Sequence, residues 1–169
     1  MNVNYFISGL EFSGKKIELF LKDISTEQAI WKPQSDRWSV LEVVNHLADE
    51  EKDDFRKRLE LTLFHPGTEW PGIDPVKWAK ERKYNHRDLL QSVTSFKEER
   101  QISLKWLKTV GAADFAKFYQ HPLIGKLTAG DLLASWLCHD YLHLRQLTTL
   151  QIEYLASLAK PHSTRYASP

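Results

Sequence analysis

The sequence predicts an all-α protein, an up-and-down bundle of four main helices in a single domain. Hydrophobic side chains recur at helical spacing in four long segments, and no segment between them shows a convincing alternating strand pattern. The length of 169 residues suits one domain that buries one core. In such bundles, metal and cofactor sites are built from side chains that project inward from facing helices.

The first two helices are expected at residues 4–23 and 39–63. The first ends in an apolar run that includes Ile17 and Leu21. The second begins at Ser39, because Ser39 and Glu42 form an S-x-x-E capping pattern directly before the apolar stretch VLEVVNHL. This pattern makes the start of the second helix the best-defined boundary in the chain.

The connection after the second helix, FHPGTEWPGIDPVKWAKERKY, contains three prolines and two tryptophans. It is long for a compact bundle, which favours a packed functional loop and admits a long crossover connection. Trp70 and Trp78 are therefore candidates for the wall or lid of a substrate pocket. The alternative, that the two rings only pack the loop onto the bundle, remains open.

The third helix is expected at residues 85–110 and the fourth at residues 128–158. The loop between them carries QHPLIGK, and Thr128 with Asp131 caps the start of the fourth helix. We expect a single domain over residues 1–159, followed by a flexible C-terminal tail over residues 160–169.

The composition excludes several classes of protein. Lys and Arg number 23 against 22 Asp and Glu, so the chain lacks the basic excess that nucleic-acid binding requires. It shows neither a signal-peptide pattern nor a membrane-spanning apolar segment, and the single cysteine, Cys138, agrees with a reducing compartment. We therefore expect a cytoplasmic protein with no nucleic-acid or membrane partner.

The stretch CHDYLHLRQL places His139 and His143 four residues apart in the fourth helix. On a helical projection both fall on the apolar side, among Leu132, Trp136, Leu147 and Leu150. Side chains at this spacing can reach one metal ion, whereas two buried imidazoles without an ion need hydrogen-bond partners that their apolar neighbours do not offer. Two satisfied core histidines are the alternative.

The second helix offers a third imidazole, His46, at the margin of its apolar stripe, with Glu50 one turn further on. Three histidines from neighbouring helices would leave an open coordination position for water, which is typical of a catalytic ion. His46 could instead be half-solvated. Glu50 is a candidate general base or a partner of a ligand, and the alternative is a pair with Arg100 or with solvent.

Arg100 falls in the middle of the inward stripe of the third helix. A guanidinium there needs either a buried carboxylate or a pocket that receives an anionic group of a substrate. A third alternative is that it reaches past the core to a surface carboxylate.

Taken together, several motifs resemble the DinB-like superfamily of metal-dependent enzymes. They are Trp38-Ser39 before VLEVVNHLADEE, the loop EWPGIDPVKWA, Phe96 with Arg100, HPLIGKLTAGDLL and HDYLHLRQL, and they span about residues 31–150. The resemblance implies a four-helix bundle, commonly a homodimer, with one divalent ion held by His46, His139 and His143. Similar proteins include thiol S-transferases that use bacillithiol-type or mycothiol-type cosubstrates, a mycothiol-dependent maleylpyruvate isomerase, and hydrolases.

The functional hypothesis is an enzyme that activates water or a thiol on a divalent ion and acts on a small molecule. Three imidazoles suit Zn²⁺ or Ni²⁺ and also admit Fe²⁺ or Mn²⁺. A hydrolase and a transferase with a low-molecular-weight thiol cosubstrate are both compatible with this hypothesis, and a non-catalytic module that binds a metal or small ligand is the alternative. Glu50 is the candidate catalytic residue, and Arg100, Trp70 and Trp78 are the candidate substrate-binding residues.

Overall fold

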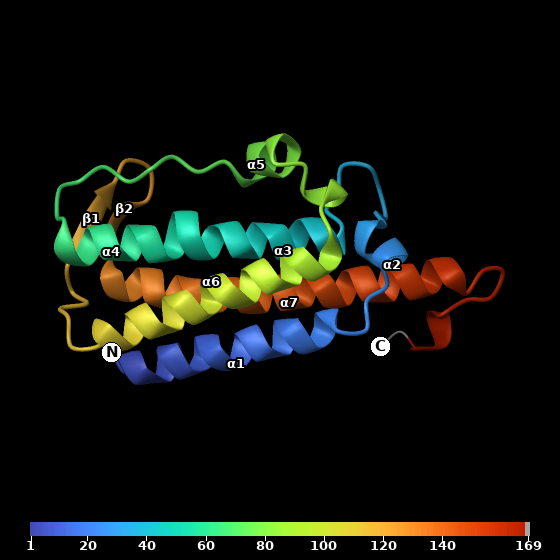
Figure 1. Cartoon of the computed structure of the whole chain (residues 1–169), viewed down its shortest axis with the longest axis horizontal. Helices are drawn as coiled ribbons and strands as arrows, with labels where there is room; N and C mark the ends of the chain where they lie inside the picture. Colours follow the sequence, from blue (N-terminus) through green and yellow to red (C-terminus); the bar gives the residue numbers. More distant parts are fainter. Residues whose placement is uncertain (168–169) are drawn as a thin grey trace.

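The computed structural model of the chain describes residues 1–167 and consists mainly of four long helical segments packed side by side (Figure 1). These segments are α1 (Val3–Leu21), α3 (Val40–Asp49) continued by a π-helical turn (Glu50–Phe55) and α4 (Arg56–Phe64), α6 (Leu89–Thr109), and α7 (Ala129–Leu158). The shorter elements are α2 (Thr26–Ile30), α5 (Pro75–Glu81), and two 3-10 turns (Tyr84–His86 and Arg165–Ala167). The predicted four-helix bundle is confirmed.

Both predicted helix starts rest on complete capping boxes. The Ser39 hydroxyl accepts from the Glu42 amide while the Glu42 carboxylate accepts from the Ser39 amide, at 3.1 and 2.8 Å. Thr128 and Asp131 make the same pair of bonds at the start of α7. Each box satisfies amide donors that a helix leaves free at its first turn, so the sequence alone defines these two boundaries.

The long connection between α4 and α6 sets the direction of the third long segment. It carries α5 back along the outside of α3 and α4, so that α6 runs in the same direction as α3 and α4 (Figure 1). Two hydrogen bonds between these segments agree with the parallel direction, because both partners lie further along the chain in the second bond: Asn45 bonds to Ser92, and Arg56 bonds to Ser103. Helix α1 and helix α7 also run parallel to each other, and each is antiparallel to the other two long segments.

The segment between α6 and α7 contains a β-hairpin, so the expectation of no strand is wrong there. Strand β1 (Phe118–His121) pairs antiparallel with β2 (Gly125–Thr128), and Phe118 lies opposite Thr128. Gly125 adopts a φ of 85° at the turn, a conformation that favours glycine. Strands of four residues are too short to show alternation in the sequence.

The interior consists of two apolar clusters separated by one buried polar layer. One cluster includes Leu10, Leu59, Leu104 and Leu133, and the other includes Ile17, Val44, Phe96 and Leu147. Between them lies a buried polar layer made of Ser13, Glu51, Arg100 and Asp140, one residue from each long segment, which are linked by hydrogen bonds. The candidate metal ligands lie on the same stretch of the bundle axis, since His139 immediately precedes Asp140.

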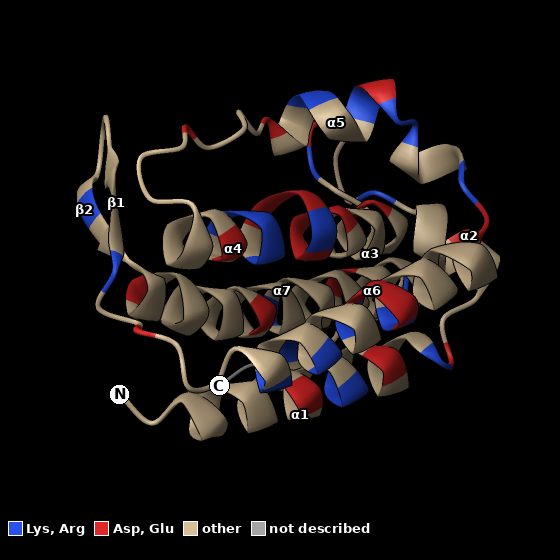
Figure 2. Cartoon of the chain, turned by 60° about the vertical axis from the view of Figure 1, so that its left-hand side comes forward, with Lys and Arg blue, Asp and Glu red and all other residues tan. Residues whose placement is uncertain are grey.

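Charged side chains of both signs are interspersed over the helices, while α7 is largely free of them (Figure 2). None of the described helices combines the length and apolar character that a bilayer crossing requires. Helix α7 ends at Leu158, next to the predicted domain end, and residues 160–167 of the predicted tail are exposed. The last two residues of that tail, 168 and 169, lie outside the described part of the chain.

Candidate metal centre

The structure brings His46, His139 and His143 together around one point. The Nε2 atom of His46 lies 3.3 Å from that of His139 and 3.1 Å from that of His143, and the remaining pair is 3.1 Å apart. His46 comes from α3, whereas the other two are one turn apart on α7. The antiparallel packing of α3 against α7 therefore completes a cluster that no single helix provides.

These three nitrogens cannot satisfy one another by hydrogen bonding. Each Nε2 of a neutral imidazole carries either a proton or a lone pair, so among three mutual contacts at least one joins two of a kind. Ligand atoms at about 2.0–2.1 Å from one tetrahedral ion are about 3.3–3.4 Å apart, close to the separations found here. The donor set and its spacing therefore fit one divalent transition-metal ion.

Burial keeps the three imidazoles neutral. Burial, with a smaller contribution from the neighbouring histidines, lowers the pKa of His46 far below its usual value. The same cause lowers the pKa of His139 to about 4 and also lowers the pKa of His143. At neutral pH all three rings hold the lone pairs that a metal ion requires, without a proton to displace.

The Nδ1 side of His143 is held by a polar neighbour on its own helix. The Nδ1–H group of His143 donates to the Gln146 amide oxygen at 2.8 Å, because that oxygen can only accept. This bond places the proton on Nδ1 and leaves the lone pair on Nε2, which faces the cluster. The ring is thus oriented for an ion before one binds.

Glu50 lies on the opposite side of His46 from the cluster. Its Oε1 atom is 3.6 Å from Nδ1 of His46, and both atoms are buried without a hydrogen-bond partner. Burial, reinforced by Asp54, raises the pKa of the Glu50 carboxyl, which favours a protonated acid. Since Nε2 of His46 faces the ion position, Glu50 is placed to hold the imidazole rather than to meet a water at the ion.

A π-helical turn allows two consecutive glutamates to be buried on different sides. Glu50 faces His46, while Glu51 accepts from Arg100 at 2.6 Å and from the Trp136 indole N–H at 2.7 Å. The wider π turn contains an extra residue relative to an α-helix, and such turns occur frequently at functional sites. Two consecutive residues of this turn, Glu50 and Glu51, therefore contact the histidine cluster and the polar layer, respectively.

The histidine cluster opens onto the surface on one side of α7. An open cavity of about 420 Å³ is lined there by His139, Leu142, His143, Arg145, Gln146 and Thr149. Two of the three cluster histidines, both from α7, therefore border a cavity that is open to solvent.

Arg100 lies in the polar layer and has a buried carboxylate partner, one of the alternatives that the sequence left open. Its side chain is 2 % exposed and donates to both oxygens of Asp140, at 2.7 and 2.8 Å, as well as to Glu51. Its position gives no support to the predicted substrate contact, because the side chain is buried and its guanidinium pairs with Glu51 and Asp140.

The two loop tryptophans lie apart from the histidine cluster and from each other. Trp70 stacks on Tyr119 of the hairpin, with ring centroids 4.1 Å apart. Trp78 lies under the guanidinium of Arg82, which pairs with Asp49 on the outer side of α3. The loop packs on the outside of α3 and α4 (Figure 1), so its rings match the packing alternative.

Trp38 and Phe55 flank the cluster, although the sequence predicts neither of them as a site residue. The Trp38 ring lies 4.8 Å from that of His46, and the Phe55 ring lies 5.1 Å from that of His139. Gln146 is likewise not among the site residues that the sequence predicts. Its position three residues after His143 on a helix indicates that the two side chains can contact each other, so this spacing could have predicted it. The positions of Trp38 and Phe55 depend on tertiary packing.

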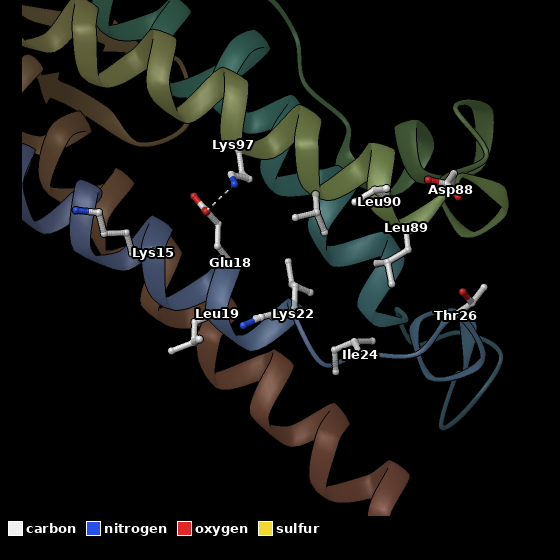
Figure 3. Close-up of a pocket in the computed structure, with 12 residues that line it drawn as sticks. Lys15, Glu18, Leu19, Lys22, Ile24, Thr26, Asp88, Leu89, Leu90 and Lys97 are labelled. Carbon is white, nitrogen blue, oxygen red and sulfur yellow. Dashed lines mark ion pairs between the residues drawn. The ribbon is translucent and has the colours of Figure 1, made fainter.

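A second hollow lies between the end of α1 and the start of α6 (Figure 3). It measures about 610 Å³, has an apolar floor that includes Leu89 and Val93, and is bridged by an ion pair between Lys97 and Glu18 at 3.3 Å. It contains neither histidine nor cysteine, so its chemistry does not resemble that of the metal centre.

Comparison with known proteins agrees with the fold and identifies the family. The sequence profile of the DinB superfamily matches residues 10–147. A protein of Oceanobacillus iheyensis, named as a candidate metal-dependent hydrolase, is 25% identical over 149 residues, which cover 88% of this chain and 85% of that protein. YfiT from Bacillus subtilis, described as a probable metal-dependent hydrolase with an unusual four-helix bundle topology, superimposes with a TM-score of 0.78 at 21% identity, over 90% of this chain and 87% of that chain. The chain is a member of the DinB superfamily.

Proposed function

We propose that this protein is a metal-dependent hydrolase of small molecules, with one divalent ion held by His46, His139 and His143. The convergence of three neutral Nε2 atoms beside an open cavity carries the proposal. Zn²⁺ or Ni²⁺ suits three imidazoles best, and Fe²⁺ or Mn²⁺ is also compatible. The names of the relatives support hydrolysis as the reaction class.

When bound, the ion would act as a Lewis acid that lowers the pKa of a water molecule to near neutrality. The protein contributes orientation: Gln146 accepts from Nδ1–H of His143, and the Oε1 atom of Glu50, an acceptor, lies 3.6 Å from Nδ1 of His46. In the hydrolysis of an ester or amide, the oxygen of water bonds to the acyl carbon, the bond to the leaving group breaks, and the leaving group takes up a proton.

Elemental analysis of untagged protein purified without chelators tests the metal centre. We expect about one equivalent of a divalent transition metal per chain, lost in His46→Ala and in His143→Ala. His162→Ala is the matched control, because this exposed histidine lies in the C-terminal segment and should leave the metal content unchanged. Stoichiometric metal in both cluster variants would contradict the assignment.

A substrate screen then distinguishes hydrolysis from thiol transfer. Hydrolysis predicts cleavage of esters or amides by the metal-loaded protein without added thiol. Thiol S-transfer remains the second candidate, because an ion with three neutral ligands and an open side can bind a thiolate as well as a water. Conjugation of an electrophile only when a low-molecular-weight thiol is supplied would favour it, and metal binding without either activity would favour a non-catalytic module.

We also propose that the protein forms a homodimer through the outer face of α1. Tyr5, Phe12 and Leu19 are exposed there at seven-residue intervals, so a two-fold axis at Phe12 would pair Tyr5 of one copy with Leu19 of the other. Sedimentation velocity should give a dimer at micromolar concentration that Phe12→Glu dissociates, and a monomeric native protein would contradict the proposal.

A further inference from the structure

The cavity beside the histidine cluster is lined by one cationic side chain, Arg145, that forms no ion pair within residues 1–167. Arg145 lines this cavity and follows His143 by two residues, which places it about 3 Å further along the helix axis and about 200° around it, so the two side chains border the cavity from different sides. The side chain is exposed, so its guanidinium can turn toward the same space as the two α7 histidines.

The other arginines of the bundle have structural partners. Five of them pair with carboxylates, and Arg87 donates to the Asn45 amide oxygen at 2.8 Å; the five are Arg37, Arg56, Arg58, Arg82 and Arg100. Arg145 forms no ion pair with any carboxylate of residues 1–167. The residues three and four positions away on α7 are Tyr141, Leu142, Thr148 and Thr149, none of which is acidic.

The surface around Arg145 contains no compensating charge on the same helix. Between Asp131 and Glu153 the only charged residues are Asp140 and Arg145, and Asp140 is buried against Arg100. Arg145 is therefore the single exposed charge along this stretch of α7, which is largely tan in Figure 2. A divalent ion held by three neutral imidazoles would keep its full charge and add to the positive potential of the cavity.

We propose that Arg145 binds an anionic group of the substrate, a carboxylate in the first instance, while the reacting carbonyl lies at the metal centre. A guanidinium presents a planar fork of donors that matches a carboxylate with two parallel hydrogen bonds. Gln146 uses its amide oxygen on His143, and its NH₂ group remains a further donor at the cavity wall. This inference rests on the proposed hydrolase function and specifies its substrate class as acidic esters or amides.

Calorimetric titration of the zinc-loaded protein with succinate and with neutral succinamide tests the proposal without requiring turnover. Succinate should bind at least about tenfold more tightly than succinamide, the effect of one charge-assisted hydrogen bond. Arg145→Gln should abolish that preference, and Arg145→Lys should retain part of it, because a lysine keeps the charge without the planar fork.

Lys105→Gln is the matched control, since it removes one exposed positive charge from α6, away from the cavity lining. Equal succinate affinity in the native protein and Arg145→Gln, or an equal loss in Lys105→Gln, would overturn the proposal. Turnover of p-nitrophenyl acetate and of p-nitrophenyl hemisuccinate is measured separately. If succinate binds through Arg145 but neither ester is turned over, the hydrolase function alone is refuted. If both esters are turned over, and for each ester the native protein and Arg145→Gln have equal kcat/KM, the anion site alone is refuted.

Discussion

The polar layer predicts that Arg100→Met destabilises the protein much more than the same substitution of a partly exposed arginine. The guanidinium of Arg100 makes three short bonds to Asp140 and Glu51, at 2.6 to 2.8 Å, with every partner at most 2 % exposed. Removing one partner of a buried ion pair leaves the others uncompensated and costs about 3–5 kcal/mol. For a chain of this size, that loss corresponds to a fall in Tm of about 6–20 °C.

The matched comparison is Arg56→Met. Arg56 of α4 pairs with Glu99 of α6 at 2.6 Å, the same distance as the pair of Arg100 with Glu51, but the side chains of Arg56 and Glu99 are 17% and 23% exposed. A partly exposed pair contributes about 1 kcal/mol or less. The difference in stability loss between the two variants therefore reports burial and the second carboxylate partner of Arg100, and not a shorter ion pair.

Urea unfolding of the chelator-treated protein measures both variants without a contribution from bound metal. Adding Asp140→Asn and Glu51→Gln to Arg100→Met should recover part of the loss, because the buried charges are then removed together. Equal losses in Arg100→Met and Arg56→Met would refute the reasoning, since burial would then have no energetic consequence at this layer.

Four further predictions concern the metal centre. Burial lowers the pKa values of all three histidines, to about 4 for His139, so zinc affinity should fall by less than about threefold between pH 7.5 and 6.0. Three histidines with the ordinary pKa would lower the zinc affinity about 50-fold over the same range. Competition with a chromophoric chelator measures the zinc affinity at each pH. The same shifts predict that the metal-free protein loses stability as the pH falls below about 6.5, because only the unfolded histidines then take up protons. Gln146→Leu should weaken zinc binding about tenfold or more in that assay with little change in the Tm of the metal-free protein, and unchanged affinity would contradict its role toward His143. Ni²⁺ should quench tryptophan fluorescence mainly through Trp38, so Trp38→Phe should remove most of the quenching while Trp106→Phe should not.

Several features are determined locally and were predictable from the sequence. The starts of α3 and α7 follow from capping boxes that involve residues three apart, and the shared face of His139 and His143 follows from the helical repeat. The inclusion of His46 needed either the family resemblance or the structure, because its partners lie about 93 residues further along the chain.

The contacts between distant segments were decided by the tertiary structure alone. The sequence placed Arg100 on an inward stripe but left its partner open, and the packing of four segments supplies Asp140 and Glu51. The β-hairpin also depends on tertiary contacts, because its strands are too short for a periodic signal in the sequence and its Tyr119 packs against Trp70 of a distant loop. A helix pattern specifies which side chains face inward, whereas which of them meet depends on helix direction and register, and the long crossover before α6 sets both through contacts that no local pattern encodes.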